Sequence, residues 1–297
     1  MSEATFRSGF IAVIGRPNVG KSTLTNDLVG EKVAIVSPKP QTTRQRIMGV
    51  CNAPGAQIVL LDTPGIHQSR TKLGAYMNKA VDDAMKGIDG LLIMVDATDI
   101  RTVDYTIAKE NAQKDLPCFL VINKIDLVHP ESLLALIDSF AEMPFRAIIP
   151  ISARKGDGLD VLKKELIAIL PKGPQYFPDD MMTDQPERVI CAELIREKSL
   201  LYLSEEIPHG IGVEILKIDK KNDHFTEIHA TIYCEKDSHK RIIIGKQGQM
   251  IRKIGSAARA EIETLLDTHI HLDLWVKVRP GWRDSVSDLK TLGYFDE

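Results

Sequence analysis

The stretch that most constrains this chain lies near its N-terminus, where residues 15–22 read GRPNVGKS and follow the pattern G-x-x-x-x-G-K-S. An apolar run at 10–14 comes directly before it, and a helical pattern at 21–29 follows. In such a loop, backbone N–H groups and the helix N-terminus surround phosphates, a lysine neutralises the outer ones, and a serine hydroxyl ligates Mg²⁺. The sequence therefore predicts a phosphate site between a strand and a helix, with Lys21 and Ser22 in these roles.

The first part of the chain alternates short apolar segments with longer helical ones. The pattern predicts strands at 10–14, 47–51, 57–61, 90–95, 118–122 and 147–149, and helices at 21–29, 73–85, 103–113, 132–140 and 158–170. This alternation is typical of a mostly parallel sheet with helices on both faces. The connection at 52–56 is too short for a crossover, so it predicts a turn between two antiparallel strands.

A proline-rich stretch separates this part from the rest. Residues 171–186 contain four prolines and one glycine, which cannot continue a helix and suit a linker. Beyond it we predict a strand at 189–194, a helix at 199–206, strands at 212–218 and 226–234, a basic apolar run at 241–244, a helix at 250–267 and a strand at 271–278. The predicted division is an α/β domain at 1–172, a linker at 173–187 and an α+β module at 188–297.

Composition excludes several classes of protein. With 297 residues, 43% of them hydrophobic and 27% charged, the chain is typical of a globular protein. No apolar run reaches the length of a membrane span, and no secretion signal is evident at the N-terminus, so we expect a cytosolic protein. The cysteines form no Cys-x-x-Cys pattern, which favours buried thiols over disulfides or zinc ligands; they are Cys51, Cys118, Cys191 and Cys234.

Two further motifs follow predicted strands and decide which nucleotide is bound. Residues 62–65 read DTPG, which places Asp62 to hold Mg²⁺ through water and Gly65 to meet a γ-phosphate. Residues 123–126 read NKID, and the Asp126 carboxylate can accept hydrogen bonds from guanine N1–H and its 2-amino group, a donor pair that adenine lacks. Residues 152–154, Ser-Ala-Arg, add backbone donors for guanine O6. The nucleotide predicted from these motifs is GTP.

With these motifs the first 170 residues resemble a translation-factor-class GTPase of the Ras-like fold. The resemblance extends to residues 41–44, Gln-Thr-Thr-Arg, and implies that Thr42 or Thr43 ligates Mg²⁺ in the GTP state. Spacing leaves the choice between them open. We expect Lys21, Thr42, Thr43 and Gly65 to act in catalysis. The predicted nucleotide-binding residues are Gly15, Arg16, Pro17, Asn18, Val19, Gly20, Lys21, Ser22, Thr23, Asp62, Thr63, Pro64, Gly65, Ile66, Asn123, Lys124, Ile125, Asp126, Ser152, Ala153 and Arg154.

One position departs from the Ras pattern. Ras-like proteins carry, after D-x-x-G, a glutamine that orients the attacking water, whereas this chain has Ile66. We therefore expect slow intrinsic hydrolysis. GTPases with an apolar residue there often use an asparagine of the phosphate loop to bind K⁺, and Asn18 stands at that position. The alternative is that Asn18 only stabilises the loop.

The second half contains a local excess of positive charge. The whole chain has a net charge of −3, yet residues 236–259 hold seven basic residues and one acidic residue. Within them, residues 242–251 read IIIGKQGQMI, which we interpret as strand, G-x-x-G loop and helix. In KH domains such a loop clamps the backbone of a single-stranded nucleic acid, although a solvated turn has the same pattern. The predicted RNA-binding residues are Arg241, Ile244, Gly245, Lys246, Gln247, Gly248, Arg252 and Lys253.

Taken together, the chain resembles the Era family of ribosome-associated bacterial GTPases over nearly its whole length. Further matching stretches are 39–44, 62–67 and 275–283. The resemblance implies a Ras-like GTPase domain followed by a type II KH domain, binding to the 3′ end of single-stranded small-subunit ribosomal RNA, a role in small-subunit assembly, and loose contact with the inner membrane. We expect a monomer, and we expect Trp282 to pack in the fold rather than anchor a membrane.

Two other functions remain open at this point. One is an RNA-binding assembly protein whose nucleotide site is only structural. The other is a membrane-associated regulatory GTPase whose C-terminal module binds a protein.

Overall fold

The computed structural model describes residues 6–66 and 71–294 and divides them into two compact units. The first unit contains the described residues of 6–34, 43–66 and 77–184. The second contains 185–294 and two segments from earlier in the chain, 35–42 and 71–76. Part of the 62–67 stretch, His67, lies outside the described residues.

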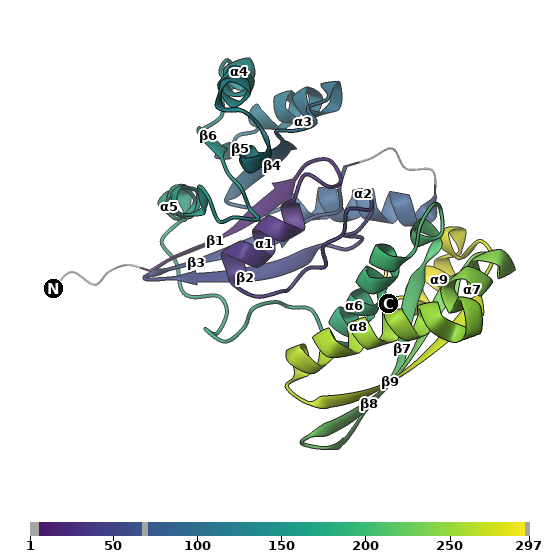
Figure 1. The fold of residues 1–297 in the computed structure, drawn as a ribbon. Helices are drawn as coiled ribbons and strands as arrows, with labels where there is room; N and C mark the ends of the chain where they lie inside the picture. Colours follow the sequence, from purple (N-terminus) through teal and green to yellow (C-terminus); the bar gives the residue numbers. More distant parts are fainter. Residues whose placement is uncertain (1–5, 67–70, 295–297) are drawn as a thin grey trace. The chain divides into compact units, whose positions relative to one another are not determined.

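The first unit is built on a six-stranded sheet with the order β2-β3-β1-β4-β5-β6 (Figure 1). Strands β1 and β3 to β6 run parallel, and β2 pairs antiparallel with β3 across the turn that 52–56 predicted. The predicted, mostly parallel sheet is confirmed. Both ends of each strand lie within three residues of the predicted bounds. The strands are β1 (Arg7–Ile14), β2 (Ile47–Ala53), β3 (Ala56–Asp62), β4 (Gly90–Asp96), β5 (Cys118–Asn123) and β6 (Ala147–Pro150).

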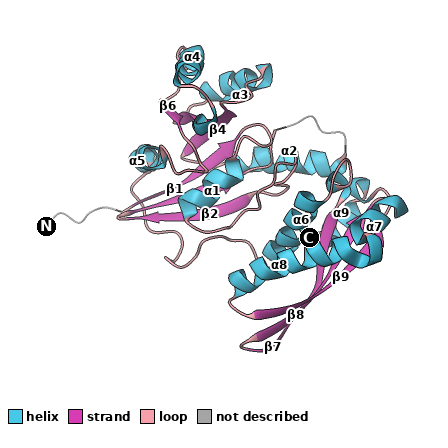
Figure 2. Cartoon of the chain, in the orientation of Figure 1, coloured by secondary structure: helices cyan, strands magenta, loops and turns pink. Residues whose placement is uncertain are grey.

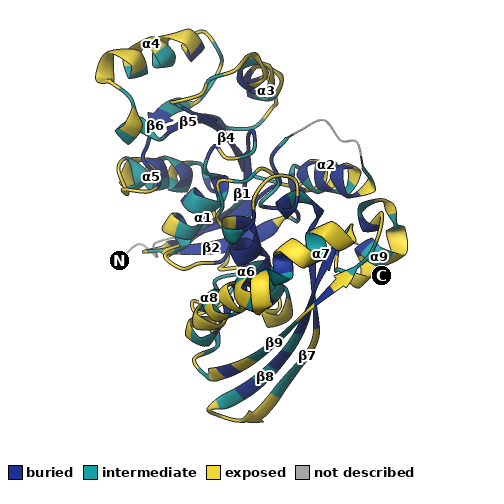
Figure 3. Cartoon of the chain, turned by 45° about the vertical axis from the view of Figure 1, so that its right-hand side comes forward, coloured by how far each residue is buried: buried dark blue, intermediate teal, exposed yellow. Residues whose placement is uncertain are grey.

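Helices cover both faces of this sheet because its strands are apolar on both sides. Side chains of α1 and α5 pack on one face, and side chains of α2, α3 and α4 pack on the other. Figure 3 shows the strands buried between exposed outer helix faces. The helices are α1 (Lys21–Val29), α2 (Lys72–Ala84), α3 (Thr102–Ala112), α4 (Pro130–Phe140) and α5 (Leu159–Ile169).

The second unit has a three-stranded sheet, β7-β8-β9, in which β7 and β8 are antiparallel and β8 and β9 are parallel (Figure 2). Apolar side chains of α6, α7 and α8 form one core with this sheet. The element order helix, two strands, two helices, strand is that of a type II KH domain. The elements are α6 (Glu187–Tyr202), β7 (Gly212–Asn222), β8 (Phe225–Cys234), α7 (Asp237–Ile244), α8 (Gln249–Leu266), β9 (His269–Val278) and α9 (Val286–Thr291).

The predicted strand at 189–194 is wrong, because these residues belong to helix α6. The apolar run VICAEL has β-like composition over six residues. Over the longer window, however, the buried residues Cys191, Leu194 and Ile195 lie three and four positions apart, which is the spacing of one helix face. The six residues 189–194 span fewer than two helical turns, which is too short a stretch to show the helical period.

The predicted strand before the G-x-x-G loop is also wrong, because 242–244 form the last turn of helix α7. Three consecutive isoleucines favour a strand by propensity. In the fold only Ile243 of them is fully buried, and it packs into the core beside α8, so tertiary packing overrides a weak local preference. Helix α9 was not predicted.

Other expectations concern single side chains. The four cysteines lie in the described part of the chain as buried, free thiols. Trp282 is fully buried, and its indole Nε1 donates a hydrogen bond to the carbonyl of Gly210 (3.0 Å), as a packing role predicts. Among residues 6–66 and 71–294, no helix combines the length and apolar character that crossing a membrane requires.

Candidate nucleotide site and RNA interface

The loop between β1 and α1 holds a buried lysine at its end. The Lys21 Nζ donates hydrogen bonds to the carbonyls of Gly15 (3.1 Å) and Arg16 (2.9 Å). Burial lowers the pKa of Lys21 to about 8, although the nearby Asp62 carboxylate opposes this shift. Because burial disfavours the charged ammonium, an anionic phosphate beside it would be stabilising. The loop thus encloses a cation that an anionic ligand can neutralise.

Three oxygen-bearing side chains meet beside this lysine. The Ser22 hydroxyl donates to Asp62 Oδ2 (2.6 Å) and lies 2.8 Å from the Thr43 hydroxyl. The other carboxylate oxygen, Asp62 Oδ1, is buried and has no hydrogen-bond partner among the described residues, and burial raises the pKa of Asp62 to about 6. Such an orphaned oxygen next to two hydroxyls fits a hard cation such as Mg²⁺, which prefers oxygen ligands.

The two switch threonines differ in what their hydroxyls contact. The Thr42 Oγ1 donates to the carbonyl of Lys39 (2.6 Å) and belongs to the segment that groups with the second unit. The Thr43 Oγ1, by contrast, contacts the Ser22 hydroxyl, which also donates to Asp62. The structure thus distinguishes Thr43 from Thr42, which the spacing in the sequence could not do.

The D-x-x-G motif lies against the phosphate loop. A Cβ on Gly65 would overlap the backbone of Pro17, so only glycine permits this close approach. The Ile66 N–H donates to the carbonyl of Gly15 (3.1 Å), and its side chain packs against the apolar core of the first unit. Ile66 therefore offers no polar side-chain atom to a water molecule. Asn18 is exposed at the loop tip with a φ of 66°.

The NKID motif at 123–126, which begins at the end of β5, connects three loops by hydrogen bonds. Asn123 Nδ2 donates to the carbonyl of Val19 in the phosphate loop (2.8 Å), and Asn123 Oδ1 accepts from the N–H of Ala153 (2.9 Å). Asp126 Oδ1 accepts a hydrogen bond from the Ser152 hydroxyl (2.8 Å). This network fixes a carboxylate at the same sheet edge as the phosphate loop, where a base could be read.

The remaining predicted residues of the nucleotide site lie in these same loops. Thr23 is in the first turn of α1, and the Thr63 hydroxyl donates to the carbonyl of Val13 (2.7 Å). Pro64 is buried, whereas Arg154 is exposed. Lys124 and Ile125 stand between Asn123 and Asp126, and the Lys124 ammonium pairs with the Asp96 carboxylate.

The G-x-x-G loop of the second unit joins two helices, α7 and α8, rather than a strand and a helix. Gly245 and Gly248 have φ values of 72° and 76°, and Lys246 and Gln247 are exposed between them. The loop leads directly into the N-terminus of the 18-residue helix α8, and the positive end of a helix dipole favours a phosphate. Arg252 donates through Nη2 to the carbonyl of Gln247 and so lies against the loop.

Next to this loop lies a groove of about 320 Å³ between α8 and β9. Its walls combine the apolar side chains Ile251, Leu272 and Leu274 with the basic Arg252 and Arg259. An apolar floor with a basic rim suits unpaired bases attached to a phosphate backbone.

Other predicted RNA-binding residues surround the loop. Arg241 is exposed on α7, and Ile244 is half-buried at its end. The Lys253 ammonium lies 4.2 Å from the centroid of the Tyr202 ring on α6, a cation–π contact that occupies this lysine.

Comparison with known proteins places this architecture in a family. Residues 10–124 match the model of 50S ribosome-binding GTPases, and residues 206–283 match the KH domain. The GTPase Era of Ruminiclostridium cellulolyticum is 56% identical over 292 residues, covering 98% of both chains. The chain belongs to the Era family of GTPases. The GTPase Era of Clostridioides difficile is 50% identical, with coverage of 98% of this chain and 100% of that protein.

Solved Era structures share the fold. A crystal structure of Era with MgGDPNP and nucleotides 1506–1542 of 16S ribosomal RNA has a TM-score of 0.93 at 42% identity, covering 97% of this chain and 99% of that one. A variant of Aquifex aeolicus Era bound to GDP·AlF4⁻ has a TM-score of 0.92, with the same identity and coverage. Membership of the Era family confirms the predicted fold class.

Within this Era-family chain, two pairs of charged residues beside the nucleotide motifs were missed by the sequence analysis. Arg16 pairs with Asp104 in the first turn of α3, and Lys124 pairs with Asp96 at the end of β4. The available signal was weak: Asp96 is the last residue of a buried strand, as Asp62 is, but it carries no recognised motif.

A glycine substitution tests the contact between the phosphate loop and Asn123. Gly20 has a φ of 106°, and a Cβ there would overlap the side-chain amide of Asn123. Gly20→Ala should therefore weaken GDP binding at least about tenfold, since the bond to the Val19 carbonyl is displaced. Binding of a fluorescent GDP analogue measures this.

Gly30→Ala is the matched control. Gly30 also has a positive φ, 88°, but nothing lies within 4 Å of the added Cβ. Backbone strain alone should cost about 1 kcal/mol of stability and leave GDP affinity unchanged. Equal losses of affinity in both variants would contradict the proposed contact.

Proposed function

We propose that the first unit binds GTP and hydrolyses it to GDP and phosphate. The observation that carries this is the meeting, at one edge of one sheet, of the buried Lys21, the Ser22–Asp62–Thr43 oxygens and the Asn123–Asp126 network. Era in complex with GDPNP, and Era bound to GDP·AlF4⁻, support the assignment by similarity.

In this proposal the residues of the first unit bind the phosphates, the guanine base and Mg²⁺. Lys21 binds the outer phosphates, the Gly65 N–H binds the γ-phosphate, and Asp126 selects guanine. Ser22, Thr43 and Asp62 would hold Mg²⁺, which neutralises charge developing on the phosphates when bound. Because Ile66 has no polar side-chain atom to orient a water, we expect slow intrinsic hydrolysis.

The second unit, in our proposal, binds single-stranded RNA of the small ribosomal subunit and acts in the assembly of that subunit. The positive-φ glycines, the exposed Lys246 and the adjacent groove support contact with a phosphate backbone and unpaired bases. The solved Era complex with a segment of 16S ribosomal RNA supports the identity of the RNA by similarity.

The remaining expectations stay part of the proposal. We place the GTPase function in 1–172, a linker at 173–187 and RNA binding in 188–297, in a monomer located in the cytoplasm. Loose contact with the inner membrane stays a prediction, which co-flotation with liposomes would test. Nothing in the described residues favours a protein partner for the KH domain over RNA.

Guanine selection predicts a change of nucleotide preference. Asp126→Asn replaces an acceptor by a donor opposite the guanine 2-amino group, so GTP affinity should fall at least about a hundredfold while xanthosine triphosphate binds better. Competition for a fluorescent nucleotide measures both affinities. Asp160→Asn, on the exposed first turn of α5, is the charge-matched control and should change neither. Unchanged GTP affinity in Asp126→Asn would refute the guanine assignment.

The magnesium site predicts different roles for the two switch threonines. Thr43→Ala should reduce Mg²⁺-dependent GTP hydrolysis at least about tenfold, because it removes a hydroxyl from the cation position. Thr42→Ala should retain hydrolysis, since the Thr42 hydroxyl donates to the main-chain carbonyls of Ser37 and Lys39. Single-turnover rates over a Mg²⁺ titration measure the difference. The reverse order of rates would assign the role to Thr42.

The potassium hypothesis predicts a salt effect. If K⁺ bound at Asn18 assists hydrolysis, replacing KCl by NaCl at constant ionic strength should slow the wild-type protein and leave Asn18→Ala nearly unaffected. The measurement is the rate of phosphate release. Equal wild-type rates in both salts would show that Asn18 only stabilises the loop.

The RNA interface predicts a loss of binding on charge reversal. Lys246→Asp with Gln247→Asp places two carboxylates against the RNA phosphates and should abolish binding of single-stranded RNA, while GTP hydrolysis by the first unit persists. Aspartate tolerates the φ of 49° at position 247, so the loop can keep its shape. Filter binding measures the RNA affinity.

The control for this double substitution changes the same charge elsewhere on the same unit. Lys220→Asp with Asn222→Asp, both exposed on β7, should bind RNA nearly as the wild type does. Wild-type affinity should fall with salt by a log–log slope of roughly −0.7 per phosphate neutralised, and duplex RNA should compete poorly. Wild-type binding by the Lys246 double variant would contradict the KH assignment.

A further inference from the structure

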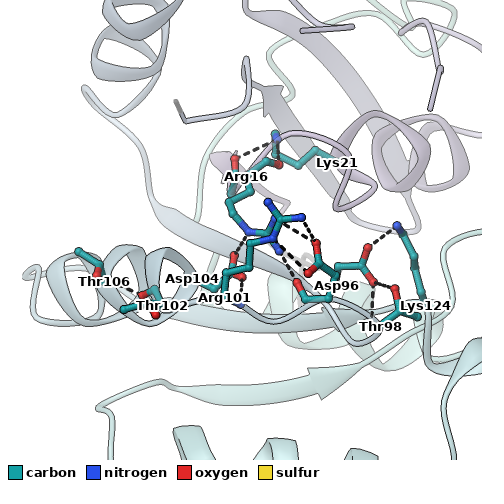
Figure 4. A network of polar contacts seen from close by, with 11 residues as sticks. Arg16, Lys21, Asp96, Thr98, Arg101, Thr102, Asp104, Thr106 and Lys124 are labelled. Atoms are coloured by element: carbon teal, nitrogen blue, oxygen red, sulfur yellow. Dashed lines mark hydrogen bonds and ion pairs between the residues drawn. The ribbon is translucent and has the colours of Figure 1, made fainter. Parts of the chain in front are cut away.

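A guanidinium from the phosphate loop is buried against the helix that follows β4. Arg16 Nε donates to Asp104 Oδ1 (2.7 Å), its Nη2 donates to the carbonyl of Asp99, and its Nη1 lies 3.5 Å from Asp99 Oδ2 (Figure 4). The side chains of Arg16 and Asp104 are only 9% and 1% exposed. A charged side chain is rarely buried unless its partners are fixed, so this pair is a built feature of the loop.

Asp104 is itself held in place by the helix it belongs to. Its second oxygen, Oδ2, accepts a hydrogen bond from the N–H of Arg101, the N-cap residue of α3 (2.9 Å). Both carboxylate oxygens therefore have partners, one on the phosphate loop and one on the helix N-terminus. Through Asp104, Arg16 is joined to the N-terminus of α3 in addition to its contacts with Asp99.

The other end of the same segment is joined to the base motif. Asp96, the last residue of β4, accepts hydrogen bonds from the N–H (2.9 Å) and hydroxyl (2.7 Å) of Thr98 through Oδ1. Its Oδ2 pairs with the ammonium of Lys124, within the NKID motif. The segment from Asp96 to Asp104 thus contacts the phosphate loop at one end and the base motif at the other.

We propose that Arg16 is a positioning residue for the nucleotide, and that its bond to Asp104 fixes the phosphate loop at the distance from the base motif that a guanine nucleotide requires. The carbonyls of Gly15 and Arg16, which contact the Lys21 ammonium, are set by this anchor. This inference rests on the proposed nucleotide site. The Arg16 guanidinium binds Asp104 and Asp99, so Arg16 acts on the nucleotide through the loop backbone and Lys21.

The test removes the pair without leaving a lone buried charge. Arg16→Met with Asp104→Leu replaces both charges by apolar groups of similar size, which a folded protein often tolerates. Asp104→Asn keeps the shape of the site and loses one of its two acceptors. We expect release of a fluorescent GDP analogue at least about tenfold faster in the double variant and severalfold faster in Asp104→Asn. The KM for GTP should rise more than kcat falls.

The control is Arg101→Met. The Arg101 side chain pairs with the exposed Asp99 carboxylate, while its contact with Asp104 is made by the backbone N–H and survives the substitution. GDP release should therefore be that of the wild type. Thermal unfolding of each protein shows whether it is folded.

The outcomes separate this inference from the proposed function. Wild-type GDP release by folded Asp104→Asn or by the folded double variant overturns the inference, as does an equal acceleration in Arg101→Met. A lower melting temperature with unchanged GDP release would make the pair structural only. Failure of the wild-type protein to bind GDP would instead overturn the proposed nucleotide site.

Discussion

The side chain of Asn123 makes the interaction on which the nucleotide site of this structure depends. One amide group reaches the phosphate loop through Val19 and the base-side loop through Ala153, at 2.8 and 2.9 Å. Three loops that are far apart in the sequence are thereby held at one edge of the sheet. This is feasible because parallel strands place all their carboxyl ends at the same edge, so loops that follow β1, β5 and β6 become neighbours. The glycine at position 20 leaves room for the amide.

Burial of charge prepares this edge for an anionic ligand and a cation. Lys21 and Asp62 are both shielded from water, and burial moves the pKa of each toward neutrality, to about 8 and about 6. Without ligands, burial of the charged lysine and carboxylate costs free energy. Phosphates beside the lysine and a cation beside the carboxylate would offset this cost. In the proposed site, the cation would provide the partner that Asp62 Oδ1 does not find among the described residues.

In the second unit, the proposed contact with RNA phosphates is made by the backbone of a loop rather than by a buried side chain. Its G-x-x-G loop exposes Lys246 between two glycines with positive φ values, at the N-terminus of a long helix. Phosphates can approach a main chain that carries no side chains at those two points, and the groove beside α8 offers apolar surface to bases. Charge is thus concentrated locally in a chain whose overall charge is −3.

The sequence by itself determined the parts of this protein that depend on short-range patterns. The motif GRPNVGKS with its flanking strand and helix, the short continuous apolar runs of β1 to β6, and the chemistry of Asp62, Asn123 and Asp126 were readable because each follows from neighbours along the chain. Tertiary structure decided the rest. The helices at 187–202 and 237–244 contain β-branched runs whose local preference is weak, so packing against the second sheet chose their conformation. The contact of Thr43 with Ser22, and of Arg16 with Asp104, joins residues 21 and 88 positions apart. No local pattern encodes such pairs, because which side chains meet at a sheet edge is set only when the strands have found their order.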